Sequence, residues 1–208
     1  MFKTIQLKNG QNIWLTSDTH FAHSNIIKKL SKWKDKSGCR NFETMEDHDH
    51  TIIDNINKLV KPNDILYHMG DWSFGDPDNV RKYRNRIACQ DIRLVLGNHD
   101  KYIAPKDSPY RGCFTSVDYV AGFSLKIDGQ PFKTKFFLSH YSHQVWPSSH
   151  HGTIHGFGHS HNSIKGIGRS MDVGVDCNNF YPFHIDEIIY QLKNVEPAIL
   201  DHHTNETN

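Results

Sequence analysis

Ile92-Arg93-Leu94-Val95-Leu96-Gly97-Asn98-His99-Asp100 is a short apolar run that ends abruptly in a small, polar loop. A run of this length and composition is typical of a buried strand. Four other places along the chain combine a short apolar run with side chains that can bind metal: Asp18-Thr19-His20, Gly70-Asp71, His140 and Gly158-His159-Ser160-His161. Open α/β sheets bind their ligands at the C-terminal ends of the strands. We therefore expect the five loops to meet at one site.

Strands and helices alternate in the first half of the chain. Apolar runs predict strands over residues 4–7, 12–16, 64–69 and 92–96, and helical spacing and capping predict helices over 24–30, 43–60 and 78–88. The Asn9-Gly10 pair predicts a hairpin between the first two strands. This alternation is typical of an α/β fold.

Strands dominate the second half. The pattern predicts strands over 117–127 and 132–139, joined by a hairpin turn at 128–131, then over 154–157 and 171–175, with a last helix over 184–192. We expect a second sheet packed on the first. The chain has no linker that would divide it, so residues 1–200 are predicted to form one domain and 201–208 a polar tail.

The balance of charged residues indicates which kinds of binding partner to expect. In 208 residues, 24 Lys and Arg nearly offset 23 Asp and Glu, which gives a net charge of +1. Long duplex nucleic acid is therefore not expected as a partner, whereas a compact phosphate ester, possibly a nucleotide, remains open because bound metals can supply positive charge. The chain has no signal-peptide pattern and no apolar stretch of membrane-spanning length, so we expect a cytoplasmic protein without a membrane partner.

The four cysteines are widely spaced and form no CxxC pair. This spacing indicates neither a zinc ribbon nor a disulfide framework. Free thiols in a reducing compartment are the expected state.

Seven side chains form the predicted metal-binding set. They are Asp18, His20, Asp71, Asn98, His140, His159 and His161. Imidazole nitrogen and carboxylate or amide oxygen suit hard or borderline divalent cations. One carboxylate can share its two oxygens between two ions, and such ion pairs lie about 3.5–4 Å apart in enzymes that displace a group at phosphorus. Each fragment alone could be an ordinary polar loop, but the ordered combination predicts a metal-dependent hydrolase of phosphate esters.

The same ordered motifs resemble those of the calcineurin-like metallophosphoesterases. Residues 17–27, 67–71 and 171–176 are similar to a small bacterial and phage branch of that family. The resemblance implies an α/β fold, a four-layer αββα sandwich of two mixed β-sheets flanked by helices. It further implies two divalent metal ions (manganese, iron, zinc or nickel), the first held by Asp18, His20 and His161, the second by Asn98, His140 and His159, with Asp71 between them.

The resemblance also implies roles for the residues beside the ligands. Two cations would acidify a bridging water, which attacks phosphorus, and His99 would lie near the leaving group as an acid or hydrogen-bond donor. We expect Asp100 to hydrogen-bond His99 and set its orientation. His23 and Arg40 are predicted to contact substrate phosphate, although each could instead be an ordinary polar residue.

Other histidines have simpler interpretations. His68 falls inside a predicted strand, where it is either a core histidine or a support for a metal ligand. Four more histidines either line the cleft or are ordinary loop residues: His143, His150, His151 and His155.

The leading hypothesis is thus a dinuclear phosphoesterase acting on phosphomonoesters or phosphodiesters. Small organic phosphates, cyclic nucleotides and nucleic-acid ends all fit the chemistry. One alternative is a non-catalytic scaffold that keeps the fold to bind protein partners. A purely structural metal site fits less well, because structural zinc prefers closed four-ligand sites that are often rich in thiolate.

Overall fold

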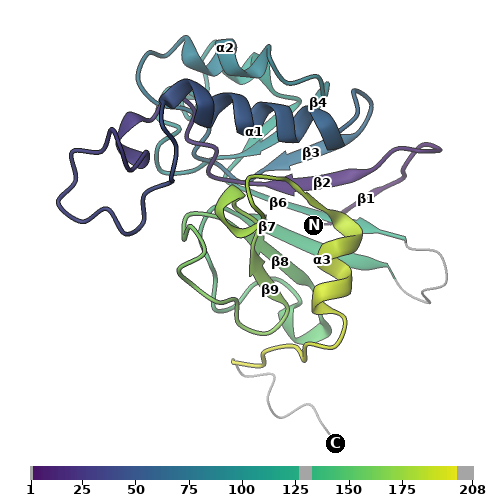
Figure 1. Ribbon diagram of the computed structural model, residues 1–208. Coiled ribbons are helices and arrows are strands. Elements are labelled where there is room, and N and C mark those ends of the chain that lie inside the picture. The colour runs from purple at the N-terminus through teal and green to yellow at the C-terminus, as the bar shows by residue number, and fades with distance from the viewer. Residues whose placement is uncertain (1, 127–132, 201–208) are drawn as a thin grey trace, which may run out of the picture.

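Two five-stranded sheets form the centre of the computed structural model, which describes residues 2–126 and 133–200 (Figure 1). The first sheet has the order β10-β2-β3-β4-β5 and the second β1-β6-β7-β8-β9. The strands are β1 (Lys3–Ile5), β2 (Ile13–Thr16), β3 (Ile65–His68), β4 (Asp91–Val95), β5 (Ser116–Asp118), β6 (Val120–Leu125), β7 (Thr134–Ser139), β8 (Ile154–Phe157), β9 (Ser170–Asp172) and β10 (Phe183–His184). Both sheets are mixed, which confirms the predicted sheet class.

The first sheet aligns the strands that precede three of the five motifs. β2, β3 and β4 pair in parallel, with Leu15 opposite Tyr67 and Tyr67 opposite Arg93. β2 and β3 are buried along their whole length, as expected for parallel strands covered on both faces. The three strands therefore end at the same edge, and the loops after them lie side by side.

The predicted hairpin at Asn9-Gly10 is wrong. The turn itself forms, since the Gln11 amide donates to the Lys8 carbonyl, but β1 pairs in parallel with β6 of the second sheet. The Asn12 amide donates instead to the buried Asp64 carboxylate, 2.8 Å away. This bond joins the start of β2 to the start of β3. An isolated two-stranded hairpin is marginal in water, whereas β1 and β2 each become part of a five-stranded sheet here.

The strand predicted over 117–127 is also wrong, because it is two strands in different sheets. β5 pairs with β4, and β6 pairs with β1 and β7. The chain crosses between the sheets at Tyr119, whose side chain is 73% exposed. The predicted turn at 128–131 lies outside the described residues, as does the tail at 201–208.

The long helix is confirmed and two others are shorter than predicted. α1 (Met45–Leu59) begins after Thr44, whose side chain accepts from the Asp47 amide. α2 spans only Asn79–Arg84. The segment after His23 forms a single 3-10 turn, η1 (Ser24–Ile26), because backbone bonds between Ile26, Lys28 and Arg40 then hold the chain in an extended bridge. α3 (Ile185–Leu192) confirms the last predicted helix.

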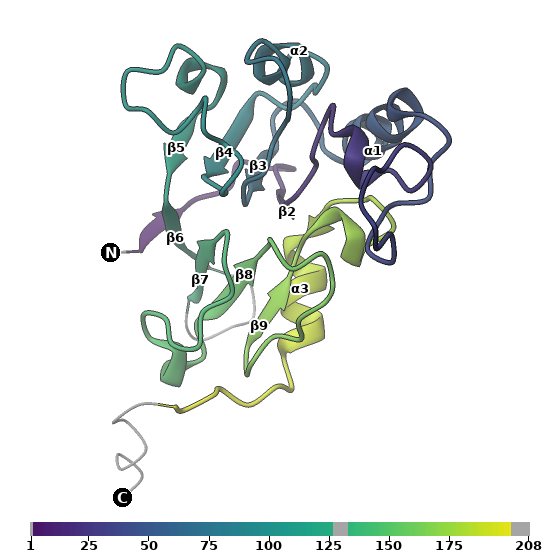
Figure 2. The same cartoon turned by 90° about the vertical axis from the view of Figure 1, so that its left-hand side faces the viewer.

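Two apolar cores lie on either side of the first sheet. α1 and α2 cover its outer face, where Ile52, Ile56 and Leu66 are fully buried. The second core lies between the sheets, and α3 closes it at the side next to β9 (Figure 2), where it also contacts β10. On the outer face of the second sheet, the rings of His143 and Trp146 pack against Phe137 and His155. No helix of the described chain combines the length and apolar character needed to cross a bilayer.

Candidate metal centre

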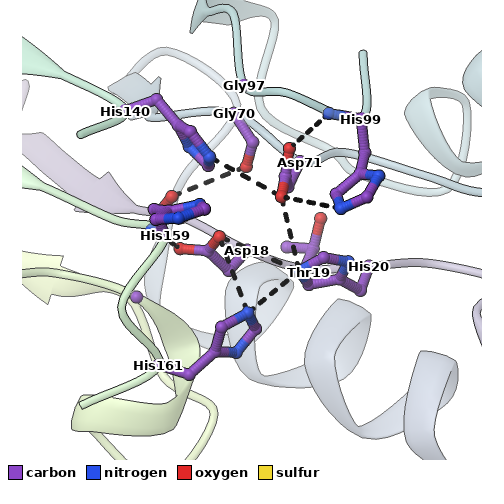
Figure 3. A network of polar contacts seen from close by, with 12 residues as sticks. Asp18, Thr19, His20, Gly70, Asp71, Gly97, His99, His140, His159 and His161 are labelled. Carbon is purple, nitrogen blue, oxygen red and sulfur yellow. Dashed lines mark hydrogen bonds and ion pairs between the residues drawn. The ribbon is translucent and has the colours of Figure 1, made fainter. Parts of the chain in front are cut away.

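The five predicted loops meet at one edge of the sandwich (Figure 3). Asp18, Asp71 and Asn98 follow β2, β3 and β4 of the first sheet. His140 follows β7 and His159 follows β8 of the second sheet. Both sheets thus contribute donors, and the structure brings all seven predicted ligands together.

The first group of candidate metal ligands contains Asp18, His20 and His161. The Nε2 atoms of the two histidines lie 3.2 Å apart, and they are 3.8 and 4.0 Å from Asp18 Oδ1. His161 donates Nδ1–H to the Asp176 carboxylate at 2.7 Å, which in the neutral ring leaves Nε2 as a lone-pair donor. Donors bound to one ion at about 2.0–2.2 Å can be no further apart than roughly 4.4 Å, so this spacing fits a shared cation.

The second group contains Asp71, His140 and His159. His140 donates Nδ1–H to the Met69 carbonyl at 2.7 Å, so in the neutral ring its Nε2 carries a lone pair. That nitrogen lies 2.9 Å from Asn98 Oδ1, which also carries lone pairs. Two acceptors this close repel each other unless a cation lies between them. The arrangement therefore fits a metal ion bound by both atoms.

Asp71 lies between the two groups. Its Oδ2 atom is 3.7 Å from His20 Nε2 and 3.6 Å from His140 Nε2. Its Oδ1 atom accepts from the His99 amide at 2.9 Å. The carboxylate is thus held by the backbone of one loop while its second oxygen faces both candidate ion positions.

Two buried atoms of the first group have no hydrogen-bond partner among the described residues. They are Asp18 Oδ1 and His20 Nδ1. Burial raises the pKa of Asp18 to about 6 and lowers that of His20 well below its ordinary value. Unpaired polar atoms at such depth are costly, and a carboxylate oxygen without a partner is what a bound cation would satisfy.

The loop backbones are held in unusual conformations. Positive φ angles between 47° and 64° occur at Asp18, His20, Asp71, His159 and His161. Each such non-glycine residue costs about 1–3 kcal/mol and is typical of functional sites. At Gly158 a Cβ atom would lie 2.0 Å from Ser17 Oγ and 2.5 Å from Asp18 Oδ2. The glycine of this motif is therefore required for the two loops to approach each other.

Asp100 does not orient His99 as predicted. Its Oδ2 accepts from the Asp71 and Gly97 amides, and its Oδ1 accepts from the Trp72 amide. The side chain is buried, and both oxygens are used by backbone groups. Burial raises the pKa of Asp100 to about 6, although these three amides act against the shift. Asp100 instead ties the loop after β4 to the loop after β3.

His99 lies beside the centre with its ring partly open to solvent. Its side chain is 45% exposed, and its Nε2 atom is 4.0 Å from Asp71 Oδ2. The ring also lies 4.6 Å from the Phe74 ring. A group in this position can reach a substrate without being a ligand.

Arg40 does not have the predicted phosphate-binding position. It is 4% exposed and makes five hydrogen bonds, two to Asp176 and the others to His48 and to the carbonyls of Asp18 and Thr19. All its N–H donors are engaged within the protein. The sequence analysis offered a phosphate contact or an ordinary polar residue and did not identify the partner Asp176, which binds the guanidinium instead.

Asp176 is a site residue that the sequence analysis did not identify. Its carboxylate accepts from Arg40 and from His161 Nδ1. Burial would raise the pKa of Asp176, but these two partners hold it well below its usual range, so the group is ionised. The residue lies at the end of the motif 171–176, which gave the only sequence signal for it.

His23 lies beside His20, and Tyr141 lies beside Asn98 and His159. The His23 ring stacks on Phe74 at 3.7 Å, and its centroid is 5.4 Å from that of His20. The Tyr141 hydroxyl donates to Asn98 Oδ1 at 3.4 Å, and the side chain is half exposed. The predicted substrate contact of His23 stays a prediction, and Tyr141 was missed.

Histidines outside the ligand set have structural contacts. His155 is buried on the far face of the second sheet, where its Nε2 accepts from the His143 amide. His68 is fully buried, its Nδ1 accepts from the Gly70 amide, and its Nε2 contacts Thr19 Oγ1 at 3.0 Å. Thr19 donates its hydroxyl to the Trp72 carbonyl, so His68 Nε2–H must be the donor in this contact. His68 is thus a core residue that also joins two motif loops.

His68 should make folding stability depend on pH in the apoprotein. Burial lowers its pKa to about 3, from about 6.5 in the unfolded chain. Between these values only the unfolded state binds the proton, so His68 contributes stability above pH 6.5 that falls by about 1.4 kcal/mol per pH unit below it. The free-energy gap between wild type and His68→Gln in urea unfolding should therefore shrink between pH 7.5 and 5. A constant gap would contradict the neutral, buried assignment.

Three comparisons relate the chain to known proteins. The family model described as calcineurin-like phosphoesterase matches residues 11–207. An uncharacterized protein of Methanocaldococcus jannaschii is 28% identical over 187 residues, which is 86% of this chain and 90% of the relative. The gene 66 protein of Mycobacterium phage L5 is 26% identical over 190 residues, which is 80% of this chain and 87% of the relative. A crystal structure of an Aquifex aeolicus protein of unknown function shares the fold, with a TM-score of 0.59 and 22% identity, over 88% of this chain and 100% of that one.

Proposed function

Because the chain belongs to the calcineurin-like phosphoesterase family, we propose that it hydrolyses phosphomonoesters or phosphodiesters with two divalent metal ions. Family membership supports metal-dependent phosphoester hydrolysis in general. The observation that carries the finer proposal is the position of Asp71 Oδ2, about equally far from His20 and His140. One carboxylate between two donor groups favours a pair of ions over a single one.

The residues present fit these ions. Asp18, His20 and His161 would hold one, and Asn98, His140 and His159 the other, with Asp71 shared. The mixed oxygen and nitrogen donors suit manganese, iron, zinc or nickel. Nothing in the donor set resembles the thiolate-rich, closed sites of structural zinc. When bound, the ions would supply positive charge to the phosphate and lower the pKa of the attacking water.

The surrounding residues have roles in the hydrolysis itself. A water oxygen forms a new bond to phosphorus, the bond from phosphorus to the ester oxygen breaks, and a proton passes to the leaving oxygen. His99, which is partly exposed and 4.0 Å from Asp71, would donate that proton or a hydrogen bond. The hydrogen bond from the Asp71 amide to Asp100 and the hydrogen bond from His161 to Asp176 hold the ligands Asp71 and His161 in place before substrate binds.

Metal-dependent turnover of two simple substrates tests the proposal. Protein stripped with chelator and reloaded with manganese should hydrolyse 4-nitrophenyl phosphate or bis(4-nitrophenyl) phosphate, and the chelated protein should not. His99→Gln should lower kcat by roughly 10²–10⁴-fold while both ions stay bound, since it removes only a proton donor. Wild-type protein that binds two ions but turns over neither ester would favour the non-catalytic scaffold.

A further inference from the structure

The segment between η1 and α1 carries a local positive charge that the balanced composition hides. Residues 28–36, which we name the lysine loop, contain Lys28, Lys29, Lys32, Lys34 and Lys36 against the single acid Asp35. Lys29 pairs with Glu43, and the Lys36 ammonium donates to the Lys28 carbonyl. Within the described chain no acidic side chain forms an ion pair with Lys32 or Lys34, and both are exposed. Their charge is therefore available to an anionic ligand.

An exposed tryptophan lies between these two lysines. Trp33 is 45% exposed, whereas Trp14, Trp72 and Trp146 are at most 9% exposed. A single exposed aromatic residue is not evidence of a site. Its position relative to the metal centre is the informative observation.

A row of rings connects Trp33 to the candidate centre. The Trp33 ring lies 5.9 Å from His23, edge to face, and His23 stacks on Phe74. Phe74 lies 4.6 Å from His99 and 5.1 Å from His20. The lysine loop therefore borders the His99 side of the centre, where the leaving group is placed in the proposed reaction.

We propose that the lysine loop binds single-stranded nucleic acid, so that the metal centre acts on an oligonucleotide phosphodiester. Trp33 stacks on a base and the ammonium groups of Lys32 and Lys34 contact backbone phosphates. An aromatic platform beside lysines is how proteins bind single strands without reading sequence. Duplex bases are already stacked on one another and offer no free face to Trp33. The inference rests on the proposed function and names the substrate class for the same site.

Binding of the single strand dT12 to the chelated protein tests the inference without turnover. Since the other tryptophans are buried, stacking should quench the fluorescence of Trp33 selectively. Trp33→Ala should raise Kd for dT12 by roughly 10- to 100-fold, because stacking contributes about 1–3 kcal/mol per base. In Lys32→Gln/Lys34→Gln the slope of log K against log salt should fall by about 1.4, or about 0.7 per phosphate contact.

A matched charge control lies at the opposite edge of the first sheet. Lys8 and Lys61 are exposed and precede β2 and β3, whereas the site follows the ends of these strands. Lys8→Gln/Lys61→Gln should leave the salt slope and the Kd for dT12 at their wild-type values. An equal loss in both double variants would indicate attraction by net charge alone and would overturn the inference.

Turnover separates this inference from the proposed function. In manganese-loaded protein, the ratio of kcat/KM for dT12 to that for bis(4-nitrophenyl) phosphate should fall in Trp33→Ala and in Lys32→Gln/Lys34→Gln. Hydrolysis of the aryl ester without any binding of dT12 would overturn the inference and leave the proposed function standing. Quenching by anionic lipid vesicles but not by dT12 would assign the loop to membrane contact and overturn it too. Absence of turnover on both substrates in manganese-loaded wild-type protein would contradict the proposed function itself.

Discussion

Asp71→Asn is expected to lower kcat/KM for an aryl phosphate ester by roughly three orders of magnitude. The substitution removes the one negative charge that faces both donor groups, at 3.6 Å from His140 and 3.7 Å from His20. Charge stabilisation by bound ions contributes several kcal/mol to such reactions, and each 1.4 kcal/mol is about tenfold in rate. The metal content of the variant should fall below two ions per chain.

Asp54→Asn provides the matched control. Asp54 lies on the exposed face of α1, and the same change of charge there should leave both activity and metal content at the wild-type level. If Asp71→Asn kept two ions and full activity, a shared carboxylate would not be part of the mechanism. Far-ultraviolet circular dichroism and the unfolding midpoint would establish that each variant is folded.

Arg40→Met is expected to destabilise the fold by about 3–5 kcal/mol. Arg40 is buried and makes a bidentate pair with Asp176, at 2.7 and 2.8 Å. Removing one partner of a buried pair leaves the other charge uncompensated, which is the costly case. Denaturant unfolding of the apoprotein measures the effect directly. The affinity of the first ion should also fall by about 10- to 100-fold, because Asp176 orients His161.

Arg81→Met is the corresponding surface variant. Its ion pair with Asp78 spans 3.8 Å at exposed positions, so its loss should cost less than about 1 kcal/mol. A destabilisation of Arg40→Met no larger than this would show that the buried pair does not support the centre. The double variant Arg40→Met/Asp176→Leu should lose less stability than the sum of its single changes, since the pair is coupled.

The motif loops could be predicted because local sequence determines them. Each follows a short buried strand, and parallel strands such as β2, β3 and β4 end at a common edge whatever the rest of the chain does. The pattern alone therefore predicted that Asp18, Asp71 and Asn98 would converge. The long helix α1 could also be predicted from local sequence, because its apolar residues are regularly spaced and Thr44 caps its start.

The errors concern interactions between distant parts of the chain. The Asn9-Gly10 turn is a valid local signal, but the partner of β1 is β6, more than a hundred residues away. Nothing near Tyr119 marks the step from one sheet to the other. The ion pair of Arg40 was missed because its partner Asp176 is 136 residues distant in the sequence. The role of Asp100 in joining two loops was missed because its hydrogen-bond partners are backbone amides, which sequence patterns do not reveal.

A crystal structure of the manganese-loaded protein, with an anomalous difference map, tests the central claim most directly. The account predicts two peaks about 3.5–4 Å apart, one beside His20 and His161 and the other beside His140 and His159, with Asp71 between them. A single peak, or two peaks that share no carboxylate, would contradict it.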